Sequence, residues 1–84
     1  MTDVTDVTHA PDRARFESGS AYLSYVRDGD TIDLQHTVVP KEMEGQGVGG
    51  ALVRAAIGFA RSEGLELVVT CPFAKTWLEK HPDA

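Results

Sequence analysis

The 84-residue sequence has a single cysteine, Cys71, and no apolar run that approaches the ~20 residues of a membrane-spanning helix. One cysteine excludes an internal disulfide framework and a zinc site built from several cysteines, and it favours a reducing compartment. The first residues carry neither the basic segment nor the apolar stretch of a signal peptide. We therefore expect a cytoplasmic protein with no metal ion and no membrane partner.

Basic residues are also scarce, since eight Lys and Arg stand against thirteen Asp and Glu and the formal net charge is −5. Proteins that bind nucleic acids hold the phosphates with clustered Lys and Arg, and the sequence has no such cluster. Nucleic acid is therefore not an expected partner. Apolar residues make up 42% of the chain, as in ordinary globular proteins. A chain of this length can build one modest core and hence one domain.

The N-terminal residues 1–12 contain two Thr-Asp-Val repeats and no aromatic residue, and we interpret them as a flexible tail. The domain is expected to span residues 13–84 and to begin with a short edge strand over residues 13–17. Two longer runs of strand-forming residues follow, at 21–27 and 31–39.

The pair Asp28-Gly29 separates these two runs and predicts a tight hairpin, because both central positions of a type I′ turn need positive φ. The second run alternates apolar and polar residues, which is the period of a half-buried strand. Its apolar face is expected to hold Ile32, Leu34, His36 and Val38.

Apolar residues recur with helical spacing from Val48 to Ala60, and Gly64 stands where a left-handed helix cap is expected. Residues 65–70 have the composition of a buried strand, which a helical crossover places parallel to an earlier strand. A second helix is expected from Pro72 onward. The predicted fold class is therefore α/β, with a mixed, mostly antiparallel sheet of about four strands and two helices.

Four glycines, Gly45, Gly47, Gly49 and Gly50, stand between the second strand-like run and the first helix. A glycine inside a helix costs about 1 kcal/mol relative to alanine, so this density needs a reason. A helix N-terminus presents unpaired N–H groups, and glycines let a pyrophosphate approach them closely. The lysine of a P-loop and the acidic residue of the dinucleotide-binding fingerprint are both missing. The alternative is a loop that only lets a helix pack closely on a sheet.

The segments Val38-Val39-Pro40 and Gly45-Gln46-Gly47-Val48-Gly49 resemble the strand end and the central motif of the GNAT acetyltransferase superfamily. The resemblance runs from about Tyr22 to Pro82 and is closest to the small, single-domain GNAT-like N-acetyltransferases with a minimal core. It implies a GNAT-like acetyl-CoA-binding core, with acetyl-CoA as cosubstrate and an amine of a protein, peptide or small molecule as acceptor. Glu44 departs from the pattern, because most members carry Arg or Gln there.

By this resemblance, the pantetheine arm would pair with the strand around Val38, and backbone N–H groups would hold the pyrophosphate. These groups belong to Gly45, Gln46, Gly47, Val48, Gly49 and Gly50. The chain has no residues for further helices over the acceptor side, so we expect an open acceptor cleft. The acidic net charge mildly favours a cationic acceptor. We expect a monomer or a weak homodimer.

The candidate catalytic residues are Cys71 and His36. Cys71 is expected at the start of the second helix, where a helix N-terminus favours the nucleophilic thiolate, and the resemblance implies a catalytic role for it. His36 can take a proton from an ammonium group near neutral pH. The alternatives are an inert buried cysteine and a satisfied core histidine. The alternative function is a non-catalytic module that binds coenzyme A or another protein.

Overall fold

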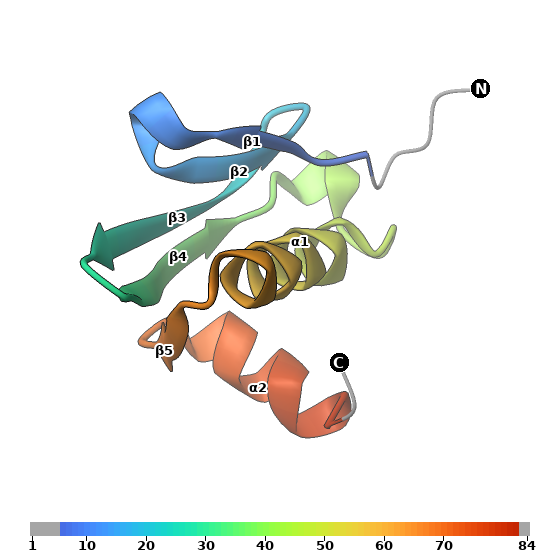
Figure 1. Ribbon diagram of the computed structural model, residues 1–84. Helices are drawn as coiled ribbons and strands as arrows, with labels where there is room; N and C mark the ends of the chain where they lie inside the picture. The colour runs from blue at the N-terminus through green and yellow to red at the C-terminus, as the bar shows by residue number, and fades with distance from the viewer. Residues whose placement is uncertain (1–5, 83–84) are drawn as a thin grey trace.

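One sheet in the order β1-β2-β3-β4-β5 is the framework of residues 6–82, which this computed structural model describes (Figure 1). Its strands are β1 (Thr8–Ala10), β2 (Arg15–Ser18), β3 (Ala21–Asp28), β4 (Thr31–Val38) and β5 (Glu66–Val69). The helices are α1 (Val48–Glu63) and α2 (Pro72–Lys80), with short 3-10 turns η1 (Pro11–Arg13) and η2 (Lys41–Met43). Only β4 and β5 are parallel neighbours. The predicted mixed α/β fold with two helices is confirmed, with one strand more than expected.

The additional strand, β1, lies in the segment predicted to be a flexible tail. It pairs antiparallel with β2 in the register Thr8↔Glu17, and η1 follows it directly. The tail prediction is therefore wrong for residues 8–12, and the sheet begins upstream of residue 13. The first part of the predicted tail, residues 1–5, lies outside the described residues.

A histidine explains why β1 is held in the sheet. The His9 ring stacks on Phe16, and it also contacts Phe59 of α1, with centroid distances of 4.4 Å in both cases. Its Nε2 lies 2.6 Å from the hydroxyl oxygen of Tyr25. Composition alone missed this packing because the segment has no phenylalanine, tyrosine or tryptophan.

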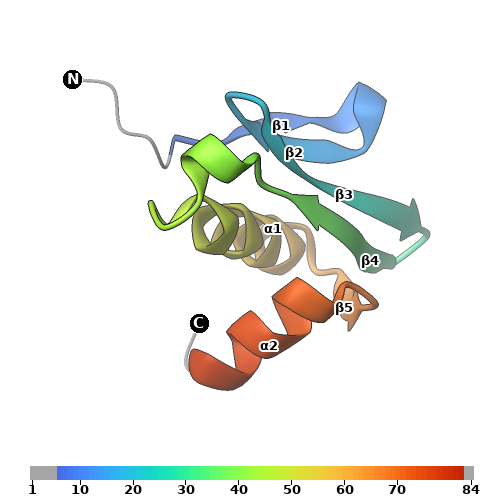
Figure 2. The same ribbon diagram turned by 180° about the vertical axis from the view of Figure 1, so that it is seen from behind.

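The core lies between α1 and one face of the sheet. Figures 1 and 2 show α1 running across the strands, with α2 beside it on the β5 side. The buried side chains of α1 are Val48, Leu52, Val53, Ala56, Ile57 and Ala60. They face Phe16, Leu23, Tyr25, Ile32 and Leu34 of the sheet. Each fully buried Leu, Ile or Val contributes about 1.5–3 kcal/mol. The predicted cap is confirmed, since Gly64 has a φ of 66° and its N–H donates to the last turn of α1.

The hairpin between β3 and β4 forms one residue later than predicted. Asp28 pairs with Thr31, so the two loop residues are Gly29 and Asp30. Gly29 has a φ of 59°, whereas Asp30 is not among the described non-glycine residues with positive φ. Glycine at the first central position is typical of a type II′ turn, so the predicted type I′ geometry is wrong.

A β-bulge in β4 changes which side chains face the core. Tyr25 pairs with Leu34, but Ser24 pairs with His36, so Gln35 is an extra residue in the ladder. Because directly opposed residues share a face, Thr37 joins Leu23 on the α1 side. His36 lies opposite Ser24 and is exposed. The predicted apolar face is therefore correct for Ile32 and Leu34 and wrong beyond the bulge.

Candidate functional site

A cleft of about 500 Å³ opens where β4 ends, α1 begins and α2 begins, and we call it the glycine cleft. All four glycines of residues 45–50 line it, two of them before α1 and two in its first turn. Its other lining residues are Thr37, Val39, Met43, Glu44, Val48, Phe73 and Trp77. The structure therefore places most of the predicted cofactor-binding turn on one concave surface.

Two of the four glycines set the path of the backbone. Gly45 and Gly47 have φ values of 79° and 78°, in the left-handed region that other residues rarely adopt. A Cβ atom at either position would meet nothing within 4 Å. Their requirement for glycine is therefore conformational rather than steric.

The other two glycines allow the helices to pack closely. A Cβ atom on Gly49 would lie 2.5 Å from the Phe73 ring, and one on Gly50 would lie 2.6 Å from the Trp77 Nε1. Helix α2 therefore approaches the first turn of α1 too closely for any side chain. Close packing, the alternative explanation for the glycines, therefore accounts for Gly49 and Gly50. The element that packs against them is α2 rather than the sheet.

The N-terminus of α1 offers free hydrogen-bond donors. The first intrahelical bond runs from the Ala51 N–H to the Gly47 carbonyl, at 3.0 Å. The N–H groups of Val48, Gly49 and Gly50 precede that bond and have no acceptor within an α-helix. The first turn has no acidic residue and no side-chain cap among the described residues. With about half a positive charge from the helix dipole, this end suits an anion.

Two side chains of the turn behave differently. The Gln46 amide donates to the Glu42 carbonyl at 3.4 Å, and its side chain is not part of the cleft lining. Glu44 is exposed and lines the cleft. A carboxylate in the lining repels an anionic ligand at short range. Because Glu44 is exposed, solvent and salt weaken this repulsion.

The edge of β4 beside the glycine cleft has a strand partner on one side only. The β4–β5 ladder ends at Leu34↔Val69, and the N–H groups of Thr70 and Cys71 then both donate to the Leu34 carbonyl, at 3.0 and 2.9 Å. Residues 36–38 of β4 pair with β3 alone among the described strands, and Gln35 is the unpaired residue of the bulge. This stretch contains Val38, which is 40% exposed and available to an extended ligand.

A second cleft of about 420 Å³ lies mainly on the face of the sheet away from α1, and we call it the sheet cleft. The register places Arg15, Ser24 and His36 in one cross-strand row. Tyr22 and Val38 are neighbours in the next row. The remaining lining residues are Gln35, Thr37, Cys71, Pro72 and Phe73. Both predicted catalytic residues, Cys71 and His36, therefore line the same cleft.

Cys71 is 2% exposed and lies at the N-cap of α2. Its sulfur is 3.3 Å from the Thr37 hydroxyl oxygen, within the hydrogen-bonding range of a thiol. The prediction that it begins the second helix is confirmed. His36, in contrast, is exposed on the opposite face rather than buried on an apolar one, because the bulge reverses the alternation of β4.

The two clefts share Thr37 and Phe73 in their linings. Sequence reasoning missed Thr37 because strict alternation placed it away from the core. It also missed Arg15 and Tyr22, whose cross-strand positions depend on the register. Phe73 and Trp77 have helical spacing, which indicates packing and does not show that they also line a cleft.

The described residues hold no group of three or more His, Cys, Asp or Glu side chains that could bind a metal ion. Within residues 6–82, neither α-helix combines the length and the apolar character needed to cross a membrane.

Known proteins resemble this chain in sequence. The family model of the GCN5-related N-acetyl-transferase matches residues 13–84. Protein NATD1 of Xenopus tropicalis is 36% identical over 52 residues, which are 62% of this chain and 48% of that protein. Protein NATD1 of Bos taurus is 37% identical over 51 residues, 61% of this chain and 45% of that protein. The chain thus spans about half the length of the curated relatives it matches.

A solved structure agrees with the family match. The NMR solution structure of a GCN5-like protein from Staphylococcus aureus superposes with a TM-score of 0.73 at 32% sequence identity. The superposition covers 96% of this chain and 83% of that one. From the agreement of sequence and fold over nearly the whole described chain, we conclude that it belongs to the GCN5-related N-acetyltransferase family.

Proposed function

We propose that this domain transfers the acetyl group of acetyl-CoA to an amine. The observation that carries the proposal is that two clefts meet at Thr37 and Phe73. One cleft contains the uncapped N-terminus of α1, and the other contains Cys71 and His36. Membership of the family supports the reaction class.

In this proposal the glycine cleft takes acetyl-CoA. Backbone N–H groups of residues 45–50 donate to the pyrophosphate, which needs no basic side chain because the helix terminus supplies the positive potential. The pantetheine amides pair with residues 35–38 of β4, as an added strand would, and Val38 is in this stretch. The thioester then lies near Thr37, where the clefts meet.

The amine binds in the sheet cleft and reaches the thioester from there. His36 takes one proton from the incoming ammonium group, which frees the nitrogen lone pair. The nitrogen attacks the thioester carbonyl, a C–N bond forms, and the C–S bond breaks. Coenzyme A leaves as a thiolate that accepts the second proton of the nitrogen, so the products are an amide and a free thiol.

Cys71 offers a second route to the same products. Its sulfur attacks the thioester carbonyl, its thiol proton passes to the departing coenzyme A thiolate, and an acetyl-cysteine forms. The amine then attacks this new thioester and returns the proton to the Cys71 sulfur as the amide leaves. The Thr37 hydroxyl, 3.3 Å away, can hydrogen-bond the sulfur in either step.

Calorimetry with acetyl-CoA tests the cosubstrate part of the proposal. We expect binding by the wild type and about tenfold weaker binding by Gly47→Ala, because a side chain strains the left-handed backbone of the turn by about 1–3 kcal/mol. Gly58→Ala is the matched control, since Gly58 lies on α1 away from the cleft and has open space around it. Absence of wild-type binding at millimolar acetyl-CoA would exclude the nucleotide function altogether.

Release of free coenzyme A in the presence of amines tests the reaction. Mass spectrometry of the protein after incubation with acetyl-CoA alone separates the two routes. An adduct of one acetyl group that is absent from Cys71→Ser supports the cysteine route. Undiminished turnover by Cys71→Ser removes Cys71 from the mechanism and leaves direct attack.

A coenzyme-A-binding module without turnover is the second candidate. It is favoured by the Glu44 carboxylate in the glycine cleft and by the near-complete burial of Cys71. Binding of acetyl-CoA together with no transfer to any amine would establish it in place of the enzyme.

A further inference from the structure

The sheet cleft has an unusual charge for a protein with a net charge of −5. Arg15 is the permanently charged residue among its described lining residues, and no Asp or Glu is among them. A cationic lining disfavours a second cationic group on an amine substrate and favours an anionic one. The local charge thus points to a different acceptor from the one favoured by the net charge.

Arg15 is held in place by a stacking contact and by one long ion pair. Its guanidinium carbon lies 3.9 Å from the centroid of the Tyr22 ring, which is stacking distance for a cation–π contact. The side chain is 39% exposed. Its Nη1 lies 3.8 Å from Glu17 Oε2, an ion pair longer than a hydrogen bond. The fork of N–H groups therefore remains available to a ligand, and it fits a carboxylate.

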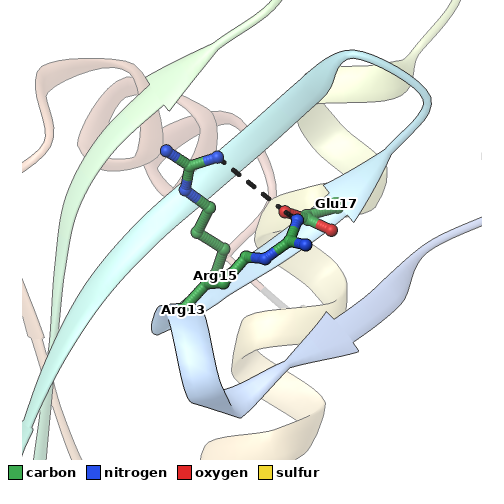
Figure 3. Close-up of polar contacts among 3 residues, drawn as sticks. All are labelled: Arg13, Arg15 and Glu17. Carbon is green, nitrogen blue, oxygen red and sulfur yellow. Dashed lines mark hydrogen bonds and ion pairs between the residues drawn. The ribbon is translucent and has the colours of Figure 1, made fainter.

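The carboxylates near the cleft are engaged elsewhere. Glu17 Oε2 accepts a hydrogen bond from Arg13 Nη1 at 3.3 Å, closer than its 3.8 Å separation from Arg15 (Figure 3). Asp33 accepts one hydrogen bond from Thr70 and one from Gln35, each at 2.7 Å. Two arginines thus share Glu17, and Arg15 is the charged group that lies in the lining of the sheet cleft itself.

The register sets the distance that a substrate must span. Arg15 pairs with Ser24, which pairs with His36, so two strand spacings separate Arg15 from His36. At about 4.8 Å per spacing, their Cα atoms are about 10 Å apart, and the long Arg side chain shortens the gap. A carboxylate a few bonds from an amine can therefore reach Arg15 while the nitrogen lies near His36.

We propose that the sheet cleft accepts an amine that carries a carboxylate, and that Arg15 determines this specificity by binding the carboxylate. This proposal rests on the proposed acetyl transfer. The shared chemistry is that of an amino acid, which occurs free or at the end of an acidic peptide. Arg15 acts on substrate choice, whereas the nitrogen and the thioester react at the junction of the two clefts.

The test compares amines that differ only in a carboxylate, with acetyl-CoA saturating. Suitable pairs are 6-aminohexanoate with pentylamine and β-alanine with ethylamine, and a second arm uses peptides with Glu or Gln after the first residue. We expect the carboxylate member to have a kcat/KM about 10–100-fold higher, the range of a charge-assisted Arg contact. Preference in the first arm alone identifies free amino acids, and preference in the peptide arm identifies acidic peptides.

The variant Arg15→Gln should bring the ratio of kcat/KM values within each pair close to one. The matched control is Arg27→Gln, which removes a guanidinium that pairs with Glu63 and should keep the ratio, because Arg27 does not line the cleft. If Arg15 had a purely structural role, the substitution would lower kcat/KM equally for both amines of a pair and would leave their ratio unchanged. That outcome, or a wild-type ratio near one in every pair, would overturn the proposal.

A binding experiment separates failure of this proposal from failure of the acetyl transfer. Backbone amide shifts of labelled protein saturated with coenzyme A are followed during titration with each pair. Shifts at Ser24 and His36 caused by the carboxylate member, and lost in Arg15→Gln, support the specificity even if no amine is acetylated. Equal shifts from both members, or no shift up to millimolar concentrations, contradict it.

Discussion

The hydroxyl oxygen of Thr37 lies 3.3 Å from the sulfur of Cys71 and links the distal end of β4 to the start of α2. The bulge at Gln35 makes this contact possible, because it turns Thr37 toward the side of the sheet that α1 covers. The only cysteine of the sequence thus has a hydroxyl partner at the junction of the two clefts.

Replacement of Thr37 should affect turnover more than cosubstrate binding. Thr37→Val keeps the shape of the side chain and removes the hydrogen bond, which is worth about 1 kcal/mol or somewhat more next to a developing thiolate. We expect kcat to fall about tenfold, whereas acetyl-CoA affinity measured by calorimetry changes less than threefold. Thr37→Ser retains the hydroxyl and serves as the control. An unchanged kcat in Thr37→Val would show that this contact is only structural.

Two glycines of α1 should respond oppositely to alanine. Gly50→Ala places a Cβ 2.6 Å from the Trp77 side chain, so Trp77 or α2 must shift, and we expect a loss of about 1–3 kcal/mol in the free energy of unfolding. Gly58→Ala meets open space and should gain about 0.5–1 kcal/mol from helix propensity. Urea denaturation followed by circular dichroism measures both. Equal effects of the two substitutions would mean that α1 and α2 are not closely packed there.

Acidification should weaken the packing of β1. Burial lowers the pKa of His9 from its ordinary value of 6.5, so the folded protein binds this proton less readily than the unfolded chain. The stability that depends on neutral His9 is therefore present above pH 6.5, and it falls as the pH drops toward the lowered pKa. Thermal melts between pH 7.5 and 5 should show a decline that is smaller in His9→Phe, which keeps an aromatic ring on Phe16. A decline of the same size in both proteins would assign the effect to other groups.

Ionisation of Tyr25, the hydrogen-bond partner of His9, should lower the stability of the fold at alkaline pH. Burial raises the pKa of Tyr25 above its ordinary value of 10.0, and nearby Arg27 opposes this in part. The folded state therefore keeps the phenolic proton longer than the unfolded chain, so the contribution is complete below pH 10.0 and is lost as the pH rises through the raised pKa. Melting temperatures between pH 9 and 11 should fall less in Tyr25→Phe than in the wild type. Parallel curves would contradict a role for Tyr25.

Removal of the carboxylate from the glycine cleft should strengthen binding of acetyl-CoA. Glu44→Gln is expected to lower the dissociation constant several-fold at low salt, with a smaller gain at high salt, because exposed charges are screened. Glu42→Gln is the control, since Glu42 belongs to the same turn and is not part of the cleft lining. Equal changes in both variants would reflect net charge rather than the position of Glu44.

The sequence by itself determined the features that depend on local chemistry. The apolar spacing from Val48 to Ala60 fixed the buried side of α1, and Gly64 fixed its end, because helix period and cap conformation are properties of neighbouring residues. Gly45 and Gly47 were placed correctly before α1, whereas Gly49 and Gly50 lie in its first turn. The resemblance of the chain to its family also depended on short contiguous segments around the glycines, and the family is confirmed.

The tertiary structure alone decided features that depend on distant partners. The bulge at Gln35 has no local signal, yet it sends His36 to one face of the sheet and Thr37 to the other. Gly49 and Gly50 require glycine only because α2, more than twenty residues later, packs against them. Likewise, β1 is held by contacts of His9 with Phe16 and Phe59. Cross-strand register and helix packing are set by which distant surfaces fit together, and a linear pattern does not contain that information.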